Sequence, residues 1–387
     1  MSEAPHPALL PTGMHDLLPP EAEIEAGVMA QLIATLTAHG YQRVKPPLVE
    51  FEETLFSGAG AAMATSTFRM MDPVSHRMIG VRADMTPQIA RIAATRLGGA
   101  PRPLRLSYAG QVLRVKGSEI RPERQVGQVG AELIGAAGAA ADVEAITVAS
   151  AALGALGLSH LTVDITLPTL VPAIIEAYEM GEENEAELRA ALDHKDVAAV
   201  TALAGNASEL LERLLLAAGP ASATLAALER LKLPERAGAE RARLSAVFDE
   251  LAAAAPELRV TVDPVENRGF EYHTGISFTF FAGGTMAHGP LGELGRGGRY
   301  DVGDPSAPEP ATGFTLYTDT ILRALPEALA VRRVLLPVGA KRAQADALHA
   351  AGWITVAGLS PVGDWRAEAR RLDCSHVLEG DNPVAVG

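Results

Sequence analysis

The amino-acid sequence predicts an α+β fold, in which an antiparallel sheet is flanked by helices, interrupted by a helical insertion and followed by a small α/β module. Three observations support this prediction. Strand-like segments such as residues 126–134 carry alternating polar residues, as expected of a sheet with a site on one face. Residues 170–257 are rich in Ala, Leu and Glu and lack β-branched runs, which favours helices. The end of the chain alternates strand and helix patterns. We expect a core over residues 1–325, the helical insertion over about 170–257 and the module over 331–387.

The individual elements follow from hydrophobic spacing and from the positions of glycine and proline. Residues 21–38 place Ile24, Val28, Leu32 and Leu36 on one face of a helix, which Gly40 ends. Strands are expected at 41–44, 78–82, 104–113, 126–134, 161–166, 259–262 and 276–281, with a strand running into a helix at 311–325. The glycine-rich residues 283–298 are interpreted as a connection. The module is expected as strand 334–337, helix 340–351, strand 353–357, helix 365–372 and strand 375–378.

Composition and charge exclude several classes of protein. Hydrophobic residues make up 48% and charged residues 21% of the 387 residues, which is the balance of a globular protein. The net charge of −14 weighs against a surface built for nucleic acid, because phosphate binding needs a basic face. The single cysteine, Cys374, excludes an internal disulfide and fits a reducing cytoplasm. The uncharged residues 145–163 do not fit a membrane span, because glycines interrupt them, and no signal-peptide pattern is present.

Two of the polar segments combine groups that can bind a small molecule. Arg82, Asp84 and Thr86 alternate beside a strand end, although a turn with an ion pair explains the same pattern. Gln128 and Glu132 share one strand face with only Gly130 between them. The missing side chain predicts a small polar pocket on the sheet, and an exposed polar strand face is the alternative.

A third segment adds a cation and aromatic groups. Residues 267–275 contain Arg268, Tyr272 and His273, and the glycine-rich residues 295–301 follow. Glycines let the backbone approach a ligand, and an arginine can bind a carboxylate through two hydrogen bonds. Alone, such a loop is weak evidence for a site.

In this order, the segments resemble histidyl-tRNA synthetase, a class II synthetase, over about residues 8–325. The resemblance rests on PTGMHD at 11–16, GYQRVKPP at 40–47, RADMT at 82–86, residues 108–135, RGFEYH at 268–273 and GGRYD at 297–301. It implies a class II synthetase-like antiparallel sheet and a dimer formed through the segment around 40–47.

The resemblance also implies a histidine-binding site. The residues it assigns to that site are Asp84, Thr86, Arg114, Gln128, Glu132, Arg268, Tyr272 and His273. Asp84, Thr86 and Gln128 would hold the α-ammonium group and Arg268 the carboxylate. Glu132 and Tyr272 would recognise the imidazole, because a carboxylate can accept a hydrogen bond from a ring N–H.

Several positions depart from the synthetase pattern where ATP would bind. Lys116 stands where the family has an acid, and Tyr317 and Thr320 stand where it has a glycine and an arginine that contacts the γ-phosphate. Loss of such an arginine costs on the order of 10³–10⁵ in phosphoryl-transfer rate. His273 replaces a tyrosine at the outer wall of the imidazole pocket. The C-terminal module is shorter than the anticodon-binding domain at the same place in the synthetase, so we do not expect tRNA binding.

A histidine pocket without an ATP pocket resembles the regulatory subunits of ATP phosphoribosyltransferase, a family of synthetase paralogues. This resemblance implies no catalysis by the chain itself, no cofactor and no metal. It implies L-histidine as ligand, a self-dimer, and a hetero-octamer with the short catalytic subunit, whose activity would need this chain and be feedback-inhibited by histidine. The alternatives are an active histidyl-tRNA synthetase and a free-standing histidine-binding module.

Overall fold

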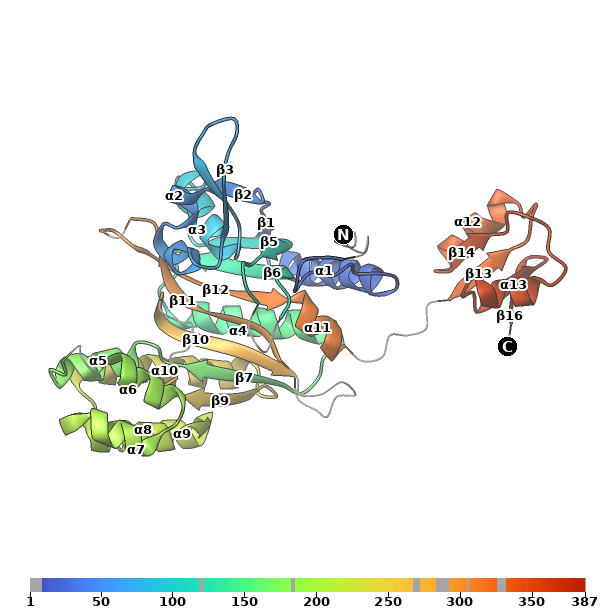
Figure 1. The fold of residues 1–387 in the computed structure, drawn as a ribbon. Helices are drawn as coiled ribbons and strands as arrows, with labels where there is room; N and C mark the ends of the chain where they lie inside the picture. The colour runs from blue at the N-terminus through green and yellow to red at the C-terminus, as the bar shows by residue number, and fades with distance from the viewer. Residues whose placement is uncertain are drawn as a thin grey trace, which may run out of the picture. The chain divides into compact units, whose positions relative to one another are not determined.

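The computed structural model describes residues 9–117, 122–181, 185–266, 272–282, 292–304, 306–325 and 332–386. The chain divides into two compact units, Met1–Leu325 and Pro326–Gly387, and each is described by itself. Figure 1 shows the first unit as a large sheet with helices around it.

The large sheet has nine strands among the described residues. In spatial order they are β1 (Gln42–Arg43), β5 (Leu104–Leu113), β6 (Gln125–Ile134), β12 (Glu309–Tyr317), β11 (Glu293–Val302), β10 (His273–Ala282), β7 (Leu161–Thr166), β9 (Arg259–Asp263) and β8 (Gly219–Pro220). Neighbours are antiparallel except for the pairs β1–β5 and β7–β9. The predicted α+β class with an antiparallel sheet is confirmed.

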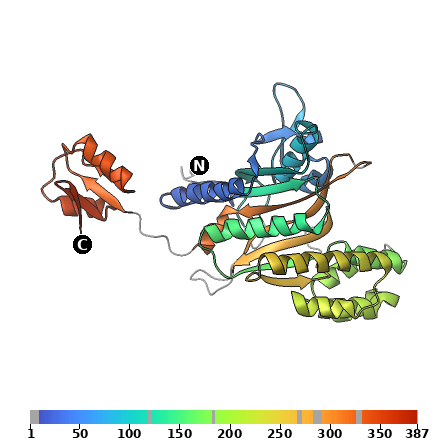
Figure 2. The same cartoon turned by 180° about the vertical axis from the view of Figure 1, so that it is seen from behind.

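Helices cover one face of this sheet, as Figure 2 shows from behind. They are α1 (Glu21–Ala38), α4 (Ala139–Ala155) and α10 (Glu235–Ala254). Their buried residues, such as Leu32, Ile146 and Leu244, form one hydrophobic core with Val129 and Ala131 of β6. Because successive side chains of a strand point to opposite faces, Gln128, Gly130 and Glu132 face away from these helices. The polar residues of β6 are therefore directed to the other side of the sheet.

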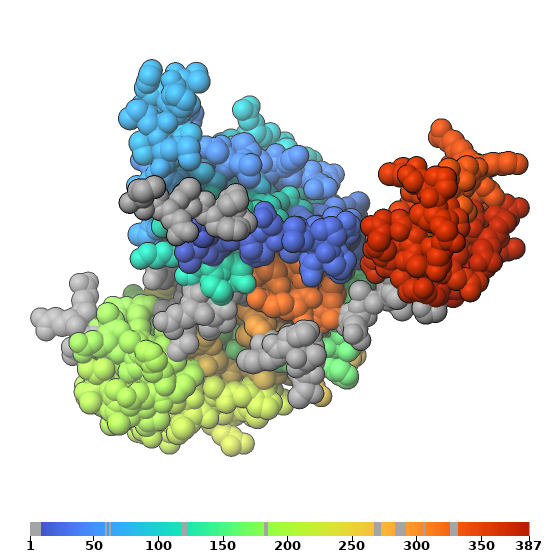
Figure 3. Space-filling model, turned by 45° about the vertical axis from the view of Figure 1, so that its right-hand side comes forward, coloured from blue at the N-terminus to red at the C-terminus, as the bar shows by residue number. Residues whose placement is uncertain are grey.

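On that other side lies a smaller layer. It consists of a three-stranded sheet in the order β2 (Val49–Phe51), β4 (Met78–Val81) and β3 (Phe68–Met71), together with α2 (Glu52–Leu55), the 3₁₀-helix η1 (Gly58–Met63) and α3 (Thr86–Thr95). Met85 and Ile89 pack with Tyr108 of the large sheet in a second core, which holds the loop before α3 over the polar face. The hairpin of β3 and β4 projects from the first unit in light blue (Figure 3) and exposes Met71 and Val74.

The insertion lies beside β7 and β9 (Figure 1) and packs into the main core. Its helices are α5 (Leu170–Ala177), α6 (Glu185–Asp193), α7 (Val197–Leu203), η3 (Gly205–Ala207), α8 (Ser208–Leu216), α9 (Ala221–Glu229) and α10. They bury apolar side chains spaced three and four residues apart, such as Leu210, Leu211 and Leu214 of α8, which is the pattern of a helix with one buried face. A short helix, α11 (Thr318–Ala324), ends the first unit.

The second unit is a four-stranded sheet in the order β14 (Ile354–Ala357), β13 (Arg333–Leu336), β15 (His376–Glu379) and β16 (Asn382–Ala385), with α12 (Arg342–Ala350) and α13 (Trp365–Arg371). The first three strands are parallel. Strand β16 is antiparallel to β15 and was not predicted. None of the helices described in either unit is long and apolar enough to cross a membrane.

One sequence interpretation is wrong. Residues 283–298 were expected to form a connection, but β11 begins at Glu293 and runs through Gly295, Gly297 and Gly298 to Val302. Residues 283–291 lie outside the described part of the chain. The backbone of β11 is hydrogen-bonded to β10 and β12 on both sides, so pairing in the sheet overrides the low strand propensity of glycine.

Candidate functional site

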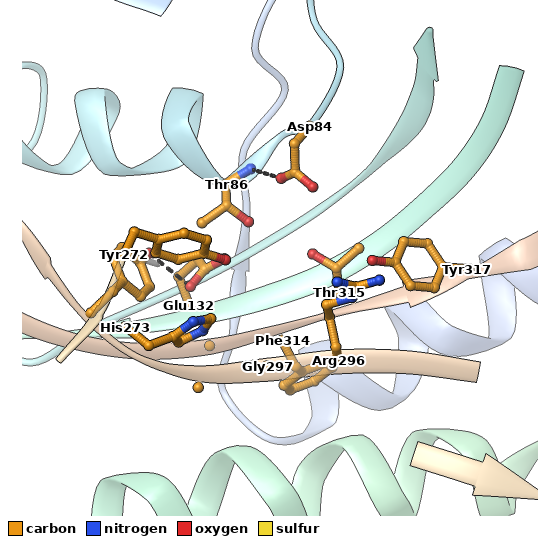
Figure 4. A pocket seen from close by; sticks show the side chains of 13 residues that line it. Asp84, Thr86, Glu132, Tyr272, His273, Arg296, Gly297, Phe314, Thr315 and Tyr317 are labelled. Carbon is orange, nitrogen blue, oxygen red and sulfur yellow. Dashed lines mark hydrogen bonds between the residues drawn. The ribbon is translucent and has the colours of Figure 1, made fainter. Parts of the chain in front are cut away.

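A small cavity opens on the polar face of the large sheet, beneath the loop that precedes α3. Its empty space, including the part open to solvent, is about 340 Å³. Figure 4 shows its main side chains. The lining residues are Asp84, Thr86, Glu132, Tyr272, His273, Arg296, Gly297, Gly298, Tyr300, Gly313, Phe314, Thr315 and Tyr317.

Glu132 lies at the floor of the cavity and is almost fully buried, with 1% of its surface exposed. The hydroxyl of Tyr300 donates to Oε2 at 2.8 Å, and that of Tyr108 lies 3.3 Å from Oε1. Burial raises the pKa of Glu132 from 4.5 to about 8; the Tyr300 hydrogen bond opposes this rise, and the nearby charge of Asp84 adds to it. Near neutral pH this carboxyl can therefore carry a proton, and it can donate to or accept from a ring nitrogen.

Glycines beneath the cavity leave room for these side chains. A Cβ atom on Gly313, opposite Glu132, would lie 1.7 Å from its Oε2 atom, and one on Gly298 would lie 2.4 Å from Cδ2 of His273. The predicted pocket over Gly130 is wrong in position, because the hydroxyl of Tyr108 lies 2.3 Å from where a Cβ would be. The cavity opens over Gly313 and Gly298 instead.

The loop before α3 is held by a hydrogen-bond network. Asp84 Oδ1 accepts from the backbone N–H of Thr86 at 2.8 Å, and Oδ2 accepts from Nε2 of Gln128 at 2.9 Å. The Oε1 atom of Gln128 accepts from the backbone N–H of Met85 at 3.1 Å. Arg82 donates to the carbonyls of Gln111 (2.8 Å) and Pro46 (3.2 Å). These hydrogen bonds of Arg82 therefore go to backbone carbonyls and not to Asp84.

At the other end of the cavity, Arg296 and Tyr317 lie together, 5.9 Å from guanidinium carbon to ring centre. Arg296 donates from Nε and Nη2 to the two carboxylate oxygens of Glu293, at 2.6 and 3.0 Å. The Tyr317 side chain and the Glu293 carboxylate raise the pKa of Arg296, so it stays cationic. Arg114 lies 6.0 Å from the Tyr317 ring. The buried Thr320 donates its hydroxyl to the Tyr317 carbonyl at 3.2 Å.

The structure brings together five of the eight residues predicted from the sequence. Asp84, Thr86, Glu132, Tyr272 and His273 line the cavity, and the rings of the last two stack with centres 4.3 Å apart.

The other three have different positions. Gln128 is fully buried behind the cavity, where it positions the Asp84 loop. Arg114 is half-buried and not in the lining. Arg268 lies outside the described residues.

Sequence reasoning did not assign five other lining residues with side chains to the histidine site: Arg296, Tyr300, Phe314, Thr315 and Tyr317. It had placed Tyr317 only where ATP would bind. The signal was available in residues 295–301, where Arg296, Gly298 and Tyr300 alternate as on one strand face. The interpretation of this segment as a connection concealed it.

Comparison with known proteins agrees with this geometry. The histidyl-tRNA synthetase family matches residues 13–321. The ATP phosphoribosyltransferase regulatory subunit of Paramagnetospirillum magneticum is 55% identical over 386 residues, which is 100% of both chains. That of Rhodospirillum centenum is 56% identical over 377 residues, or 97% of this chain and 96% of the relative. The chain belongs to the family of ATP phosphoribosyltransferase regulatory subunits. This confirms the resemblance found in the sequence.

Solved structures place this regulatory-subunit family on the histidyl-tRNA synthetase fold. A Bacillus halodurans protein described as an ATP phosphoribosyltransferase regulatory subunit/histidyl-tRNA synthetase superposes with a TM-score of 0.78 at 25% identity, over 96% of this chain and 97% of that one. Histidyl-tRNA synthetase from Nostoc superposes with a TM-score of 0.74 at 16% identity, over 95% and 90% of the two chains. The second likeness is one of fold alone.

Proposed function

We propose that this regulatory-subunit relative binds L-histidine in the cavity over Glu132. The observation that carries the proposal is the pairing of two unlike carboxyl groups in one small cavity. Asp84 is held by a backbone N–H and the Gln128 amide, whereas Glu132 is buried against tyrosine hydroxyls. An ammonium group matches the first and an imidazole nitrogen matches the second. Thr86 and Gln128 support the ammonium end, and Tyr272 and His273 form the wall beside the ring.

The same face of the sheet supports the proposal that the chain does not form histidyl-adenylate. Tyr317 is 2% exposed and fills the sheet face between Arg114 and Arg296. Thr320 is buried with its hydroxyl on a backbone carbonyl, and Lys116 is exposed. Histidine-dependent ATP–pyrophosphate exchange should therefore be at background, while a histidyl-tRNA synthetase assayed beside it is active. Exchange at a synthetase-like rate would contradict this part of the proposal.

Histidine binding would serve regulation of a partner. The names of the relatives support the catalytic subunit of ATP phosphoribosyltransferase as that partner, and we propose its short form. We propose a cytoplasmic hetero-octamer in which this chain dimerises through its synthetase-like core, supports catalysis by the partner and conveys feedback inhibition by histidine. The coupling requires that histidine bind the inactive state of the complex better than the active one.

Calorimetry tests the ligand and the site together. The purified chain should bind L-histidine, and Glu132→Gln should weaken binding by on the order of ten- to a hundredfold, because a hydrogen bond to a charged or ring group is lost or reversed. Glu144→Gln is a matched control, since Glu144 also accepts from a tyrosine hydroxyl (Tyr41, 3.0 Å) but lies outside the cavity lining. Equal affinities of the two variants would place the histidine site elsewhere.

A further inference from the structure

We propose that the Arg296 end of the cavity is the subsite for the α-carboxylate of the bound amino acid. This inference rests on the proposed function and adds a specificity-determining residue to it. Among the described residues that line the cavity, Arg296 is the one arginine or lysine. A zwitterion removed from water needs a counter-charge for its carboxylate as well as for its ammonium group, because an unpaired buried charge is costly.

The strand register places Arg296 within reach of a ligand that also contacts Glu132. Across the sheet, Gly298, Gly313 and Glu132 lie in one row, and Arg296, Thr315 and Gly130 lie in the next row on the same face. Rows two residues apart are separated by about 7 Å along the strands. Because the carboxyl of Glu132 lies over Gly313, it approaches β11 across the intervening strand. A small amino acid can therefore extend from Glu132 toward Arg296.

The direction of the side chains agrees with this register. Figure 4 shows Tyr272 and His273 at one end of the cavity, Arg296 beside Thr315 and Tyr317 at the other, and Asp84 above them. The ring of one ligand would thus contact the aromatic wall and the buried carboxyl of Glu132. Its ammonium group would lie near the anion Asp84, and its carboxylate near the cation Arg296. In an amino acid the ammonium and carboxylate groups branch from the α-carbon and the ring lies on the other side of that carbon, which fits an anion and a cation away from the aromatic end.

The hydrogen bonds of Arg296 leave it able to bind a carboxylate. Glu293 accepts from Nε and from Nη2, which fixes the plane of the guanidinium. The remaining N–H groups of an arginine can still donate to a second carboxylate in a two-bond arrangement. Glu293 is therefore a positioning residue, and it also reduces the net charge that the ligand meets. The alternative is a purely structural role, in which the Arg296–Glu293 ion pair only stabilises the start of β11.

Two ligands that differ only at the carboxylate separate these roles. L-Histidine and L-histidinol share the imidazole and the ammonium group, but histidinol carries a neutral CH₂OH group. In calorimetry at pH 7 with the full chain, we expect the wild type to prefer histidine by on the order of ten- to a hundredfold. Arg296→Gln should reduce this preference to within about threefold, mainly by weakening histidine. Arg296→Lys should be intermediate, because lysine keeps the charge without the planar fork.

The controls distinguish this inference from its alternatives. Arg323→Gln removes an arginine that also pairs with two carboxylates, Glu123 and Asp319, but lies outside the cavity, and it should keep the full preference. Glu293→Gln should keep or increase the preference, because its amide oxygen still accepts from the guanidinium and the competing negative charge is gone. If Arg296 only stabilised the start of β11, Glu293→Gln and Arg296→Gln would change the affinity for both ligands alike. Arg268→Gln is measured in parallel. Loss of the preference in Arg268→Gln alone, or an undiminished preference in folded Arg296→Gln and Arg296→Lys, would overturn the inference. Failure of the wild type to bind histidine would instead contradict the proposed function.

Discussion

The buried carboxyl of Glu132 should make the stability of the ligand-free chain depend on pH in a way that one substitution removes. Burial raises the pKa of Glu132 from 4.5 to about 8. Between these values the folded chain holds a proton that the unfolded chain has released. The unfolded state then binds fewer protons, so the free energy of unfolding falls as pH rises through this window. Glu132→Gln keeps the shape of the side chain but cannot titrate, and its stability should not show this fall.

The size of the effect follows from one proton. The slope is at most about 1.4 kcal/mol per pH unit, and it is approached only well inside the window. From pH 5.5 to 7.5 the wild type should therefore lose roughly 2–3 kcal/mol relative to Glu132→Gln. Above pH 8 the difference should level off, because Glu132 is then ionised in both states.

Urea unfolding of both proteins at several pH values without histidine measures this difference. Glu144→Gln is the control, because the hydrogen bond from Arg105 lowers the pKa of Glu144. The stabilising contribution of the Glu144 carboxylate is therefore lost only as pH falls through the acidic range. The Glu144→Gln curve should run parallel to the wild type from pH 5.5 to 7.5. A Glu132→Gln curve that is also parallel would refute the reasoning and show that Glu132 titrates as an ordinary exposed acid.

The other predictions concern the packing around the site. Gly313→Ala should weaken histidine binding more than tenfold and cost roughly 1–3 kcal/mol of stability, since its Cβ would overlap Glu132. Gly238→Ala in α10 should instead stabilise by about 0.5–1 kcal/mol, because no atom beyond the adjacent residues and the helix's own backbone lies within 4 Å of the new Cβ. Similar urea midpoints for the two variants would be inconsistent with the tight contact at Gly313. Asp142→Ala should destabilise by roughly 3–5 kcal/mol, because it leaves the buried Arg299 without its carboxylate, and a thermal unfolding change below about 1 kcal/mol would contradict this.

Local patterns predicted the elements whose side chains repeat regularly. The first helix was expected at 21–38 and is Glu21–Ala38, and the strand expected at 104–113 is Leu104–Leu113. Apolar residues at helical spacing in the first and alternating residues in the second carry the signal. Strand β11 carries three glycines, Gly295, Gly297 and Gly298. Glycines weaken the alternation of side chains along this strand, and its pairing with β10 and β12 establishes it.

The site was predictable where one strand defines it and not where several strands meet. Placing Gln128 and Glu132 on one face required only the two-residue period of β6. The position of the cavity depends on Tyr108, which reaches from β5 over Gly130, and no spacing within one segment contains that information. Arg296 was missed because residues 283–298 were interpreted as a connection. Its position beside Thr315 of β12 is a contact between strands.

The central claim is that this chain senses histidine on behalf of a catalytic partner, and partner turnover tests it most directly. The short catalytic subunit is assayed for ATP phosphoribosyltransferase activity alone, with the wild-type chain and with Glu132→Gln, over a range of histidine concentrations. We expect the wild type to support turnover and histidine to suppress it, whereas Glu132→Gln should support turnover but need on the order of ten- to a hundredfold more histidine for the same inhibition. The same inhibition curve for both chains, or full turnover without either chain, would contradict the account.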